Sequence, residues 1–281
     1  MSDLPDYELE KTPSESDPPT RSSGPASGVW VAVAVLIAAA GAAAYFAFAW
    51  RPRPAPQPTS APTAAARPAP PLGGTAEPVA IPPLDASDAI VRTLVRALSG
   101  SPAVATWLST DGLIRNFTVV VANIADGATP AKHLRTLRPS SPFEVIERRG
   151  ISYLDARSYD RYAVIADAVA SIDPAGAARL YATIKPRVEE AHRELGFADQ
   201  SFDRTLQRAI VAMLHTPIVD GPVALKPKGI GYAFADERLE GLTSAQKQLL
   251  RMGPRNVRII KGQLRRIALA LGVPSDTLPS Q

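Results

Sequence analysis

Residues 251–272 read RMGPRNVRIIKGQLRRIALALG, a stretch with six basic residues and no acidic one. Its apolar side chains recur every three or four residues, at Val257, Ile260, Leu264, Ile267 and Leu271. Its basic side chains form a second series at the same spacing, made of Arg251, Arg255, Arg258, Lys261 and Arg265. This spacing predicts a helix with one apolar face toward a protein core and a separate basic face. Gly253 and Pro254 divide it from an earlier helical segment, which begins at a T-x-x-Q capping box over 243–246.

The basic face allows two interpretations, and the sequence leaves both open. Its cations can pair with Asp and Glu of neighbouring helices, or favour the negative end of their own helix. Alternatively, the face binds an anionic lipid, an anionic glycan or an acidic envelope protein. We do not expect a nucleic-acid partner, because no aromatic interleaving and no known nucleic-acid-binding motif accompanies the charge.

The basic helix belongs to a folded domain predicted for residues 84–275, which is long enough to bury a sizeable core. Helical spacing of apolar residues recurs over 84–100, 109–127, 155–173, 173–196 and 201–217. The β-branched run within 109–127 leaves a strand possible there, and Pro186 predicts a break or kink. A hairpin turning at Gly150 and a second extended segment over 222–234 complete the pattern. The domain is therefore expected to be mainly α-helical with a small β element.

A transmembrane helix is predicted for residues 28–50, which are apolar and carry no charge. Trp30 and Trp50 would lie about 30 Å apart along such a helix, so each indole would sit at a membrane interface. A cleaved signal peptide is the alternative, because Ala47–Ala49 fits a small-x-small cleavage pattern. The length of the apolar run and the acidic segment before it favour an uncleaved single-pass helix.

The segments beside this helix have compositions that predict no packed core. Residues 1–27 hold six acidic and two basic residues and are expected to be a disordered tail. Residues 51–83 are rich in Pro and Ala and predict a semi-extended linker, and 276–281 form a short tail. The layout favours a bacterial inner-membrane protein with a cytoplasmic N-terminus and a periplasmic domain. The opposite orientation would make the chain a membrane-tethered cytoplasmic adaptor.

Asp155 is the single candidate for catalysis, because a carboxylate beside Tyr153 and Tyr159 could act as a general acid or base. In the competing interpretation, Asp155 is the N-cap of the helix that follows it. Glu189 and His192 form an E-x-x-H pair, but a dimetal site needs a second copy, which the other histidines do not supply. The chain has no cysteine, which excludes disulfides and thiolate chemistry. We predict no metal and no cofactor.

Four stretches follow one another in the order LDASD, YLDARSYDRY, SFDRTLQRAIVAMLHTPIVDGP and SAQKQLLRMGPRNVRIIKGQLRRI. In this order they resemble an uncharacterised bacterial family, catalogued as domain of unknown function number three-zero-one-four. The most specific piece of the resemblance is QKQLLRMGP. The resemblance implies a single-pass membrane protein of Gram-negative-type bacteria and adds weight to a cytoplasmic N-terminus. It implies no activity and no catalytic residues.

These features together predict a membrane-anchored envelope protein with a non-catalytic binding or scaffold domain. One alternative is an envelope enzyme that acts on lipid or peptidoglycan through carboxylate acid/base chemistry. A concave pocket with two converging carboxylates would favour that enzyme. The other alternative is the cytoplasmic adaptor. The sequence defines neither the ligand nor the oligomeric state.

Overall fold

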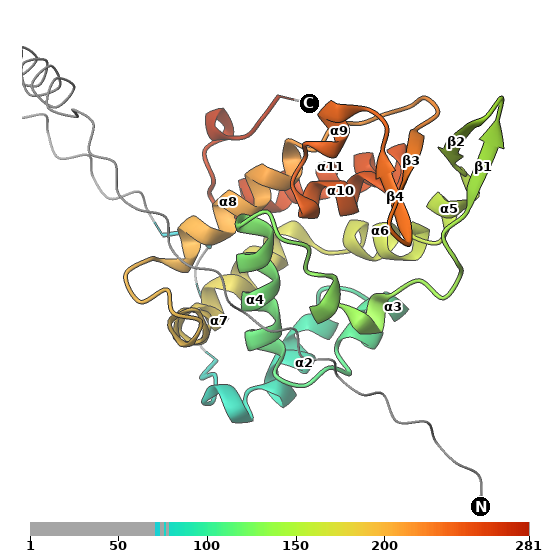
Figure 1. The fold of residues 1–281 in the computed structure, drawn as a ribbon. Helices are drawn as coiled ribbons and strands as arrows, with labels where there is room; N and C mark the ends of the chain where they lie inside the picture. The colour runs from blue at the N-terminus through green and yellow to red at the C-terminus, as the bar shows by residue number, and fades with distance from the viewer. Residues whose placement is uncertain (1–70, 74–75, 77–78, 281) are drawn as a thin grey trace, which may run out of the picture. The chain divides into compact units, whose positions relative to one another are not determined.

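The computed structural model describes residues 71–73, 76 and 79–280. Its α-helices are α2 (Asp88–Arg96), α3 (Pro102–Trp107), α4 (Leu113–Ala125), α5 (Arg157–Asp160), α6 (Ala163–Ala170), α7 (Pro174–Glu194), α8 (Phe202–Leu214), α9 (Glu237–Glu240), α10 (Ser244–Leu250) and α11 (Pro254–Ala270). Its strands are β1 (Val145–Arg148), β2 (Ile151–Leu154), β3 (Ala224–Lys228) and β4 (Gly231–Phe234). Short 3-10 turns are η1 (Leu84–Ala86), η2 (Ala131–His133), η3 (Arg135–Leu137) and η4 (Ser275–Thr277). The domain is mainly helical, with the small sheet at one side (Figure 1).

The transmembrane part of the predicted fold class is corrected by the structure. Within 71–73, 76 and 79–280, no helix is long and apolar enough to cross a membrane. The longest of these helices, α7, has 21 residues, but charged side chains such as Lys185 and Arg187 interrupt its apolar positions. The predicted span, residues 28–50 with Trp30 and Trp50, lies outside the described residues. The fold class supported here is mainly α with a small antiparallel sheet, and the membrane and single-pass assignments are withdrawn.

Helix α11 forms over the stretch that its sequence pattern predicts, with its apolar face toward a core. It runs from Pro254 to Ala270 and packs against α6, α7 and α8. Val257 and Ile260 are buried on its apolar face, against Tyr162 of the neighbouring chain segment. The preceding helix, α10, begins at the predicted capping box, in which Thr243 and the side chain of Gln246 satisfy each other's backbone N–H groups. Both predictions are confirmed.

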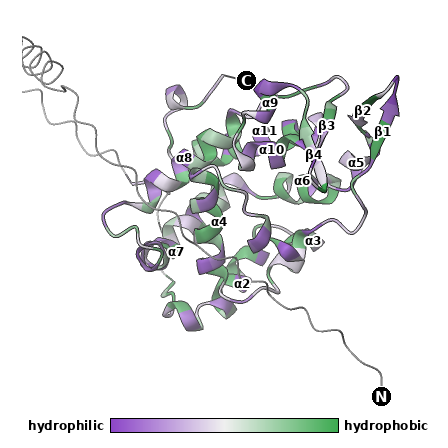
Figure 2. Cartoon of the chain, viewed as in Figure 1, coloured by the Kyte–Doolittle hydropathy of each residue, from purple (hydrophilic) through white to green (hydrophobic). Residues whose placement is uncertain are grey.

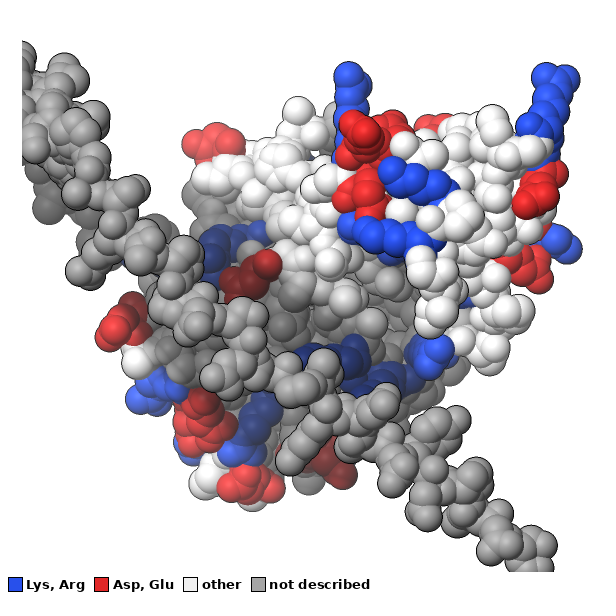
Figure 3. All heavy atoms as spheres, in the orientation of Figure 1, with Lys and Arg blue, Asp and Glu red and all other residues white. Residues whose placement is uncertain are grey.

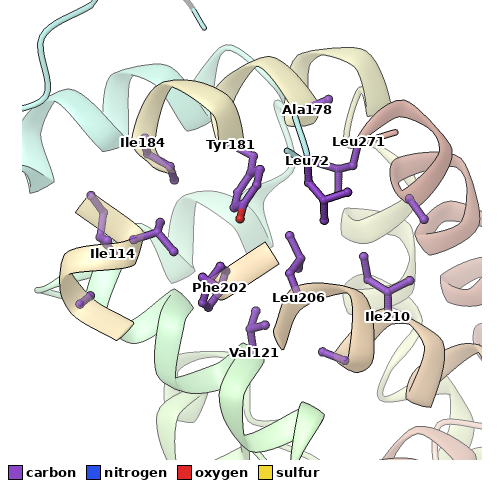
Figure 4. Packing of buried hydrophobic residues seen from close by; sticks show 14 of the residues in the cluster. Leu72, Ile114, Val121, Ala178, Tyr181, Ile184, Phe202, Leu206, Ile210 and Leu271 are labelled. Atoms are coloured by element: carbon purple, nitrogen blue, oxygen red, sulfur yellow. The ribbon is translucent and has the colours of Figure 1, made fainter. Parts of the chain in front are cut away.

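The main hydrophobic core lies where α4, α7 and α8 meet (Figure 4). Phe202, the first residue of α8, is completely buried there. Its ring centroid lies 5.8 Å from that of Phe117 and 6.3 Å from that of Tyr181. Helix α4 is predominantly apolar along its length (Figure 2), which fits its place between α7 and α8. The strand that the sequence left possible over 109–127 does not form.

A short segment that the sequence assigned to the linker is packed onto this core. The side chain of Leu72 is buried next to Leu271 (Figure 4). The backbone N–H of Leu72 donates to Asp203 at 3.1 Å, and that of Gly73 donates to the carbonyl of Leu271 at 2.9 Å. Tyr181 also donates to the Asp203 carboxylate, at 2.6 Å. The folded unit therefore includes residues near 72 as well as the predicted domain.

Helix α7 continues through Pro186, where the sequence predicted a break or kink. Proline lacks the N–H of one helical hydrogen bond, which weakens an isolated helix at that position. The ring of Pro186 is exposed, whereas Ile184 and Val188 on either side are buried in the main core. Tertiary packing of these neighbours holds the helix together across the proline, so the predicted break is wrong.

The sheet is antiparallel, in the order β1-β2-β3-β4. Each outer pair is a hairpin, and β2 joins β3 through the register Ser152 with Leu225. The first hairpin turns at Gly150, which has a φ of 76° as such a tight turn requires. Both extended segments predicted from the sequence are therefore present as hairpins. One face of the sheet covers a small core that contains Leu154 and Phe234.

Candidate functional site

Two arginines of the basic helix form ion pairs at the protein surface. Arg255 lies 3.5 Å from the carboxylate of Asp167, and both side chains are more than half exposed. Arg258 donates to the carboxylate of Asp220, which raises the pKa of the Arg258 guanidinium. Such exposed pairs contribute little to stability, because water and salt screen them.

The other three predicted anion-binding residues also contact groups of their own domain. The guanidinium carbon of Arg251 lies 4.9 Å from the ring centroid of Phe234. Lys261 donates to the carbonyl of Thr216 at 2.8 Å, and its burial lowers the pKa of its ammonium group. Arg265 donates at 2.6 Å to a main-chain carbonyl near the C-terminus. Each of the five side chains thus contacts a different group of the domain. On the face of the protein seen in Figure 3, acidic and basic groups lie side by side.

Arg255 also lines a hollow, which we call the α5–α11 hollow. Its volume is about 320 Å³, and its lining residues are Ala156, Arg157, Tyr159, Asp160, Ala163, Pro254, Arg255 and Asn256. One wall comes from the segment around α5 and the other from the first turn of α11. The hollow therefore joins segments about one hundred residues apart in the chain.

A glycine and an asparagine hold these two walls together. Gly253 has a φ of 86°, and a Cβ atom built on it would lie 2.3 Å from Cγ of Tyr159. The tyrosine ring therefore packs directly on the glycine backbone, where no other residue leaves room. The buried amide of Asn256 donates to the carbonyl of Tyr159 at 2.9 Å and to that of Met252 at 2.8 Å. These contacts fix the start of α11 against α5.

Arg157 is held at the edge of this hollow by Asp155. The Asp155 carboxylate accepts the backbone N–H of Arg157 at 2.9 Å and two guanidinium N–H groups at 3.0 and 2.7 Å. The side-chain hydrogen bonds from Arg157 lower the pKa of Asp155 and raise that of Arg157. Asp155 immediately precedes the N-cap position, Ala156. Its carboxylate thus orients Arg157 and also satisfies a free N–H at the start of α5.

The helix predicted over 155–173 is divided, and residues around the division line a second hollow. Helix α5 ends at Asp160 and α6 begins at Ala163, so the chain changes direction at Arg161 and Tyr162. The second hollow, here called the α3–α6 hollow, has a volume of about 390 Å³. Its lining residues are Pro102, Ala103, Thr106, Thr136, Leu137, Arg138, Pro139, Ser140, Ser141, Asp160, Arg161, Val164 and Ile165.

Arg161 is a charged residue of the α3–α6 hollow that contacts three neighbouring groups. It donates to the carbonyl of Ser141 at 3.3 Å and to the hydroxyl of Tyr162 at 3.1 Å. Its guanidinium carbon also lies 5.9 Å from the ring centroid of Phe143. The buried Nε of Arg161 has no hydrogen-bond partner within the part of the chain that the structure describes.

Asp160 lines both hollows, so the two hollows adjoin at this residue. It contributes the only carboxylate among the lining residues of either hollow. Four arginines, Arg138, Arg157, Arg161 and Arg255, accompany it. A guanidinium donates in a planar fork that matches carboxylates and phosphates, and carboxylates of the domain already pair with Arg157 and Arg255.

The E-x-x-H pair has a structural role at the junction of α7 and α8. Glu189 accepts the backbone N–H of Phe202 at 3.0 Å. His192 is completely buried, stacks on Phe197 with ring centroids 4.6 Å apart, and lies 3.3 Å from the hydroxyl of Thr205. In the described residues, no group of three or more acidic or histidine side chains could hold a metal ion.

Sequence reasoning selected Arg255 but missed the residues that accompany it. The stretch YLDARSYDRY also contains Arg157, Asp160 and Arg161, which follow Asp155. The sequence pattern in this stretch indicated only the Asp155 carboxylate and the tyrosines as candidates. The two walls come together only in the folded chain, through the hydrogen bond from Asn256 to Tyr159. The available signal was the pair of arginine-containing motifs, YLDARSYDRY and MGPRN.

A family model described as "Protein of unknown function (DUF3014)" matches residues 113–268. The chain belongs to this family. The match covers more than half of the 281 residues and includes every residue that lines the α5–α11 hollow. No curated protein and no solved structure matches the chain. Membership of DUF3014 brings no activity with it, so a function has to be argued from the site.

Proposed function

We propose that this DUF3014 protein is a non-catalytic binding module, which holds an anionic group of a partner in the α5–α11 hollow. The observation that carries the proposal is the meeting of Arg157 and Arg255 in one hollow of about 320 Å³. Each guanidinium can donate two parallel hydrogen bonds to one carboxylate. The positive end of the 17-residue helix α11 also faces this hollow and favours a negative charge there.

The present partners of both arginines leave them open to a ligand. Arg157 is 74% exposed although it contacts the carboxylates of Asp155, at 2.7 Å, and Glu144, at 3.2 Å. Arg255 and Asp167 are 66% and 60% exposed, and their closest nitrogen and oxygen atoms lie 3.5 Å apart. A pair this exposed is worth about 0–1 kcal/mol. An anion that contacts both guanidinium groups at once can therefore replace Asp167 as the partner of Arg255, or share Arg255 with it.

The same geometry disfavours acid/base catalysis by Asp155. Its carboxylate is occupied by three N–H groups of Arg157, which lower its pKa and keep it ionised. A general acid needs a raised pKa and a free path to the substrate. Only Asp160 supplies a carboxylate to the lining of the two hollows, whereas glycoside-type hydrolysis uses a pair. Binding is the function that these residues support.

Arg255→Ala tests the proposal, with Arg266→Ala as the matched control. Arg266 is an exposed arginine of the same helix and lines neither hollow. The probe is the dipeptide acetyl-Glu-Glu-amide, and its dissociation constant is measured by NMR titration. Loss of a charge-assisted hydrogen bond costs about 1.5 kcal/mol, so Arg255→Ala should weaken binding about tenfold. Equal weakening by Arg266→Ala would show general charge attraction instead of a site.

A further inference from the structure

We propose that the natural ligand is an extended acidic polypeptide segment, which lies along both hollows and crosses Asp160. Its acidic side chain contacts Arg157 and Arg255, and an apolar side chain next along the segment enters the α3–α6 hollow. This inference rests on the proposed function, because it adds a second contact to the same site. It names the class of partner, a protein with an acidic and apolar segment.

The adjacency of the two hollows at Asp160 carries the first step. Tyr159 lines the α5–α11 hollow, Asp160 lines both hollows, and Arg161 lines the α3–α6 hollow. A ligand can therefore pass from one hollow to the other over a single residue of the protein. Two hollows of about 320 and 390 Å³ in a row suit an extended chain better than one compact small molecule.

The charges at the two hollows carry the second step. Four residues that line the two hollows are arginines and one is an aspartate. Arg157 already pairs with Asp155 and Glu144, and Arg255 pairs with Asp167, so an acidic segment would share or replace these contacts. Within the described chain, the side chains of Arg138 and Asp160 form no hydrogen bond or ion pair, whereas the backbone N–H of Arg138 donates to Arg135. Asp160 lies at the junction and repels carboxylates there. The acidic residues of the ligand therefore lie away from Asp160, at the end that enters the α5–α11 hollow, and the middle of the ligand presents main-chain N–H groups.

The apolar groups of the α3–α6 hollow carry the third step. Val164 on α6 is 62% exposed, although valine is usually buried in helical domains. Leu137 and Ile165 line the hollow beside it. The ring of Phe143, also exposed, lies against Arg161 nearby. An apolar side chain of a peptide would cover Val164, whereas a polyanionic glycan has no such group to place there.

Peptides of two lengths test the inference and separate it from the proposed function. The short probe is acetyl-Glu-Glu-amide, and the long probes add Gly-Gly-Leu-Val after the glutamates or Val-Leu-Gly-Gly before them. Two glycines reach about 7 Å, which allows the apolar residues to enter the adjoining hollow. Binding is measured by calorimetry with the full chain. We expect one long probe to bind at least tenfold more tightly than the short one.

Val164→Asp is the decisive variant, and Leu269→Asp is its matched control. Leu269 is an exposed apolar residue on α11, 46% accessible, and lines neither hollow. The added carboxylate of either variant lowers the affinity for both acidic probes through charge alone, and Leu269→Asp measures this general effect. Val164→Asp should in addition remove the advantage of the long probe over the short one, whereas Leu269→Asp should keep that advantage. If the short probe binds and the long probes bind no more tightly, the inference is overturned and the proposed function stands. If Arg255→Ala leaves the short probe unaffected, the proposed function itself fails.

Discussion

The side-chain amide of Asn256 donates a 2.9 Å hydrogen bond to the main-chain carbonyl of Tyr159, a residue 97 positions earlier in the chain. The same amide donates to Met252, and both acceptors are main-chain oxygens. Asn256 is 3% exposed, so water cannot replace either bond. One buried amide thus joins the first turn of α11 to the end of α5, and the α5–α11 hollow depends on this junction.

Asn256→Asp should lower stability with almost no change of shape. A carboxylate placed against two carbonyl oxygens loses both donors and leaves buried polar atoms without partners, which costs about 1–3 kcal/mol. The free energy of unfolding in urea measures the effect. The matched control is Gln207→Glu on α8, where the amide has no described hydrogen bond, and it should change stability by less than about 0.5 kcal/mol. Equal losses in the two variants would contradict the role given to Asn256.

Two glycines near the start and in the middle of α11 should respond to alanine in opposite directions. At Gly253 the φ of 86° and the contact with Tyr159 both exclude a Cβ atom, so Gly253→Ala should cost more than about 1 kcal/mol. At Gly262 no atom lies within 4 Å of the added Cβ, so Gly262→Ala should stabilise the helix by about 0.5–1 kcal/mol. Thermal unfolding of both variants checks the signs, and a destabilised Gly262→Ala would contradict this account of α11.

Stability should fall as the pH decreases below about 6.5, the ordinary pKa of histidine. Burial lowers the pKa of His192 and also that of His133. As the pH falls, these histidines therefore bind protons in the unfolded chain before they do so in the folded chain. The stability that they contribute above the unfolded-state pKa is lost as the pH falls from that pKa toward the lower folded-state pKa. Urea midpoints between about pH 7.5 and pH 5 measure the slope.

The variant His192→Phe separates the contribution of the completely buried His192 from that of His133. Phenylalanine can occupy the same stack against Phe197. The variant should flatten the slope between about pH 6.5 and pH 5, with His133 left to account for the remainder. Carboxylates with lowered pKa values, such as Glu240 at about 2, lose their contribution only at lower pH. An unchanged slope in His192→Phe would contradict the assignment.

Local signals in the sequence predicted the parts of the fold that depend on neighbouring residues. The α11 pattern, the Thr243 capping box and the turn at Gly150 all lie within a few positions of the residues that form them. Pro186 misled the prediction, because the force that holds α7 together is packing by other helices. The division of 155–173 was likewise missed, since Tyr162 turns the chain by packing on α10 and α11.

The candidate site was only partly predictable for the same reason. The charge of its own helix identified Arg255 as a candidate. Arg157 and Asp160 become candidates only because α11 packs beside them in the folded chain. Nothing in the spacing of the basic residues indicates that Arg251 turns toward Phe234. A site built from two distant segments becomes visible when a contact such as that between Asn256 and Tyr159 is known.

The most direct measurement is an NMR map of where acetyl-Glu-Glu-amide binds. Backbone amide signals of the full chain would be followed as the dipeptide is added at low salt, where charge screening is weakest. The account predicts that the largest shifts cluster at Arg157, Asp160, Arg255 and Asn256, and that they disappear in Arg255→Ala. Shifts centred on Arg266, or spread evenly over the basic residues of α11, would contradict the claim that this hollow is the binding site.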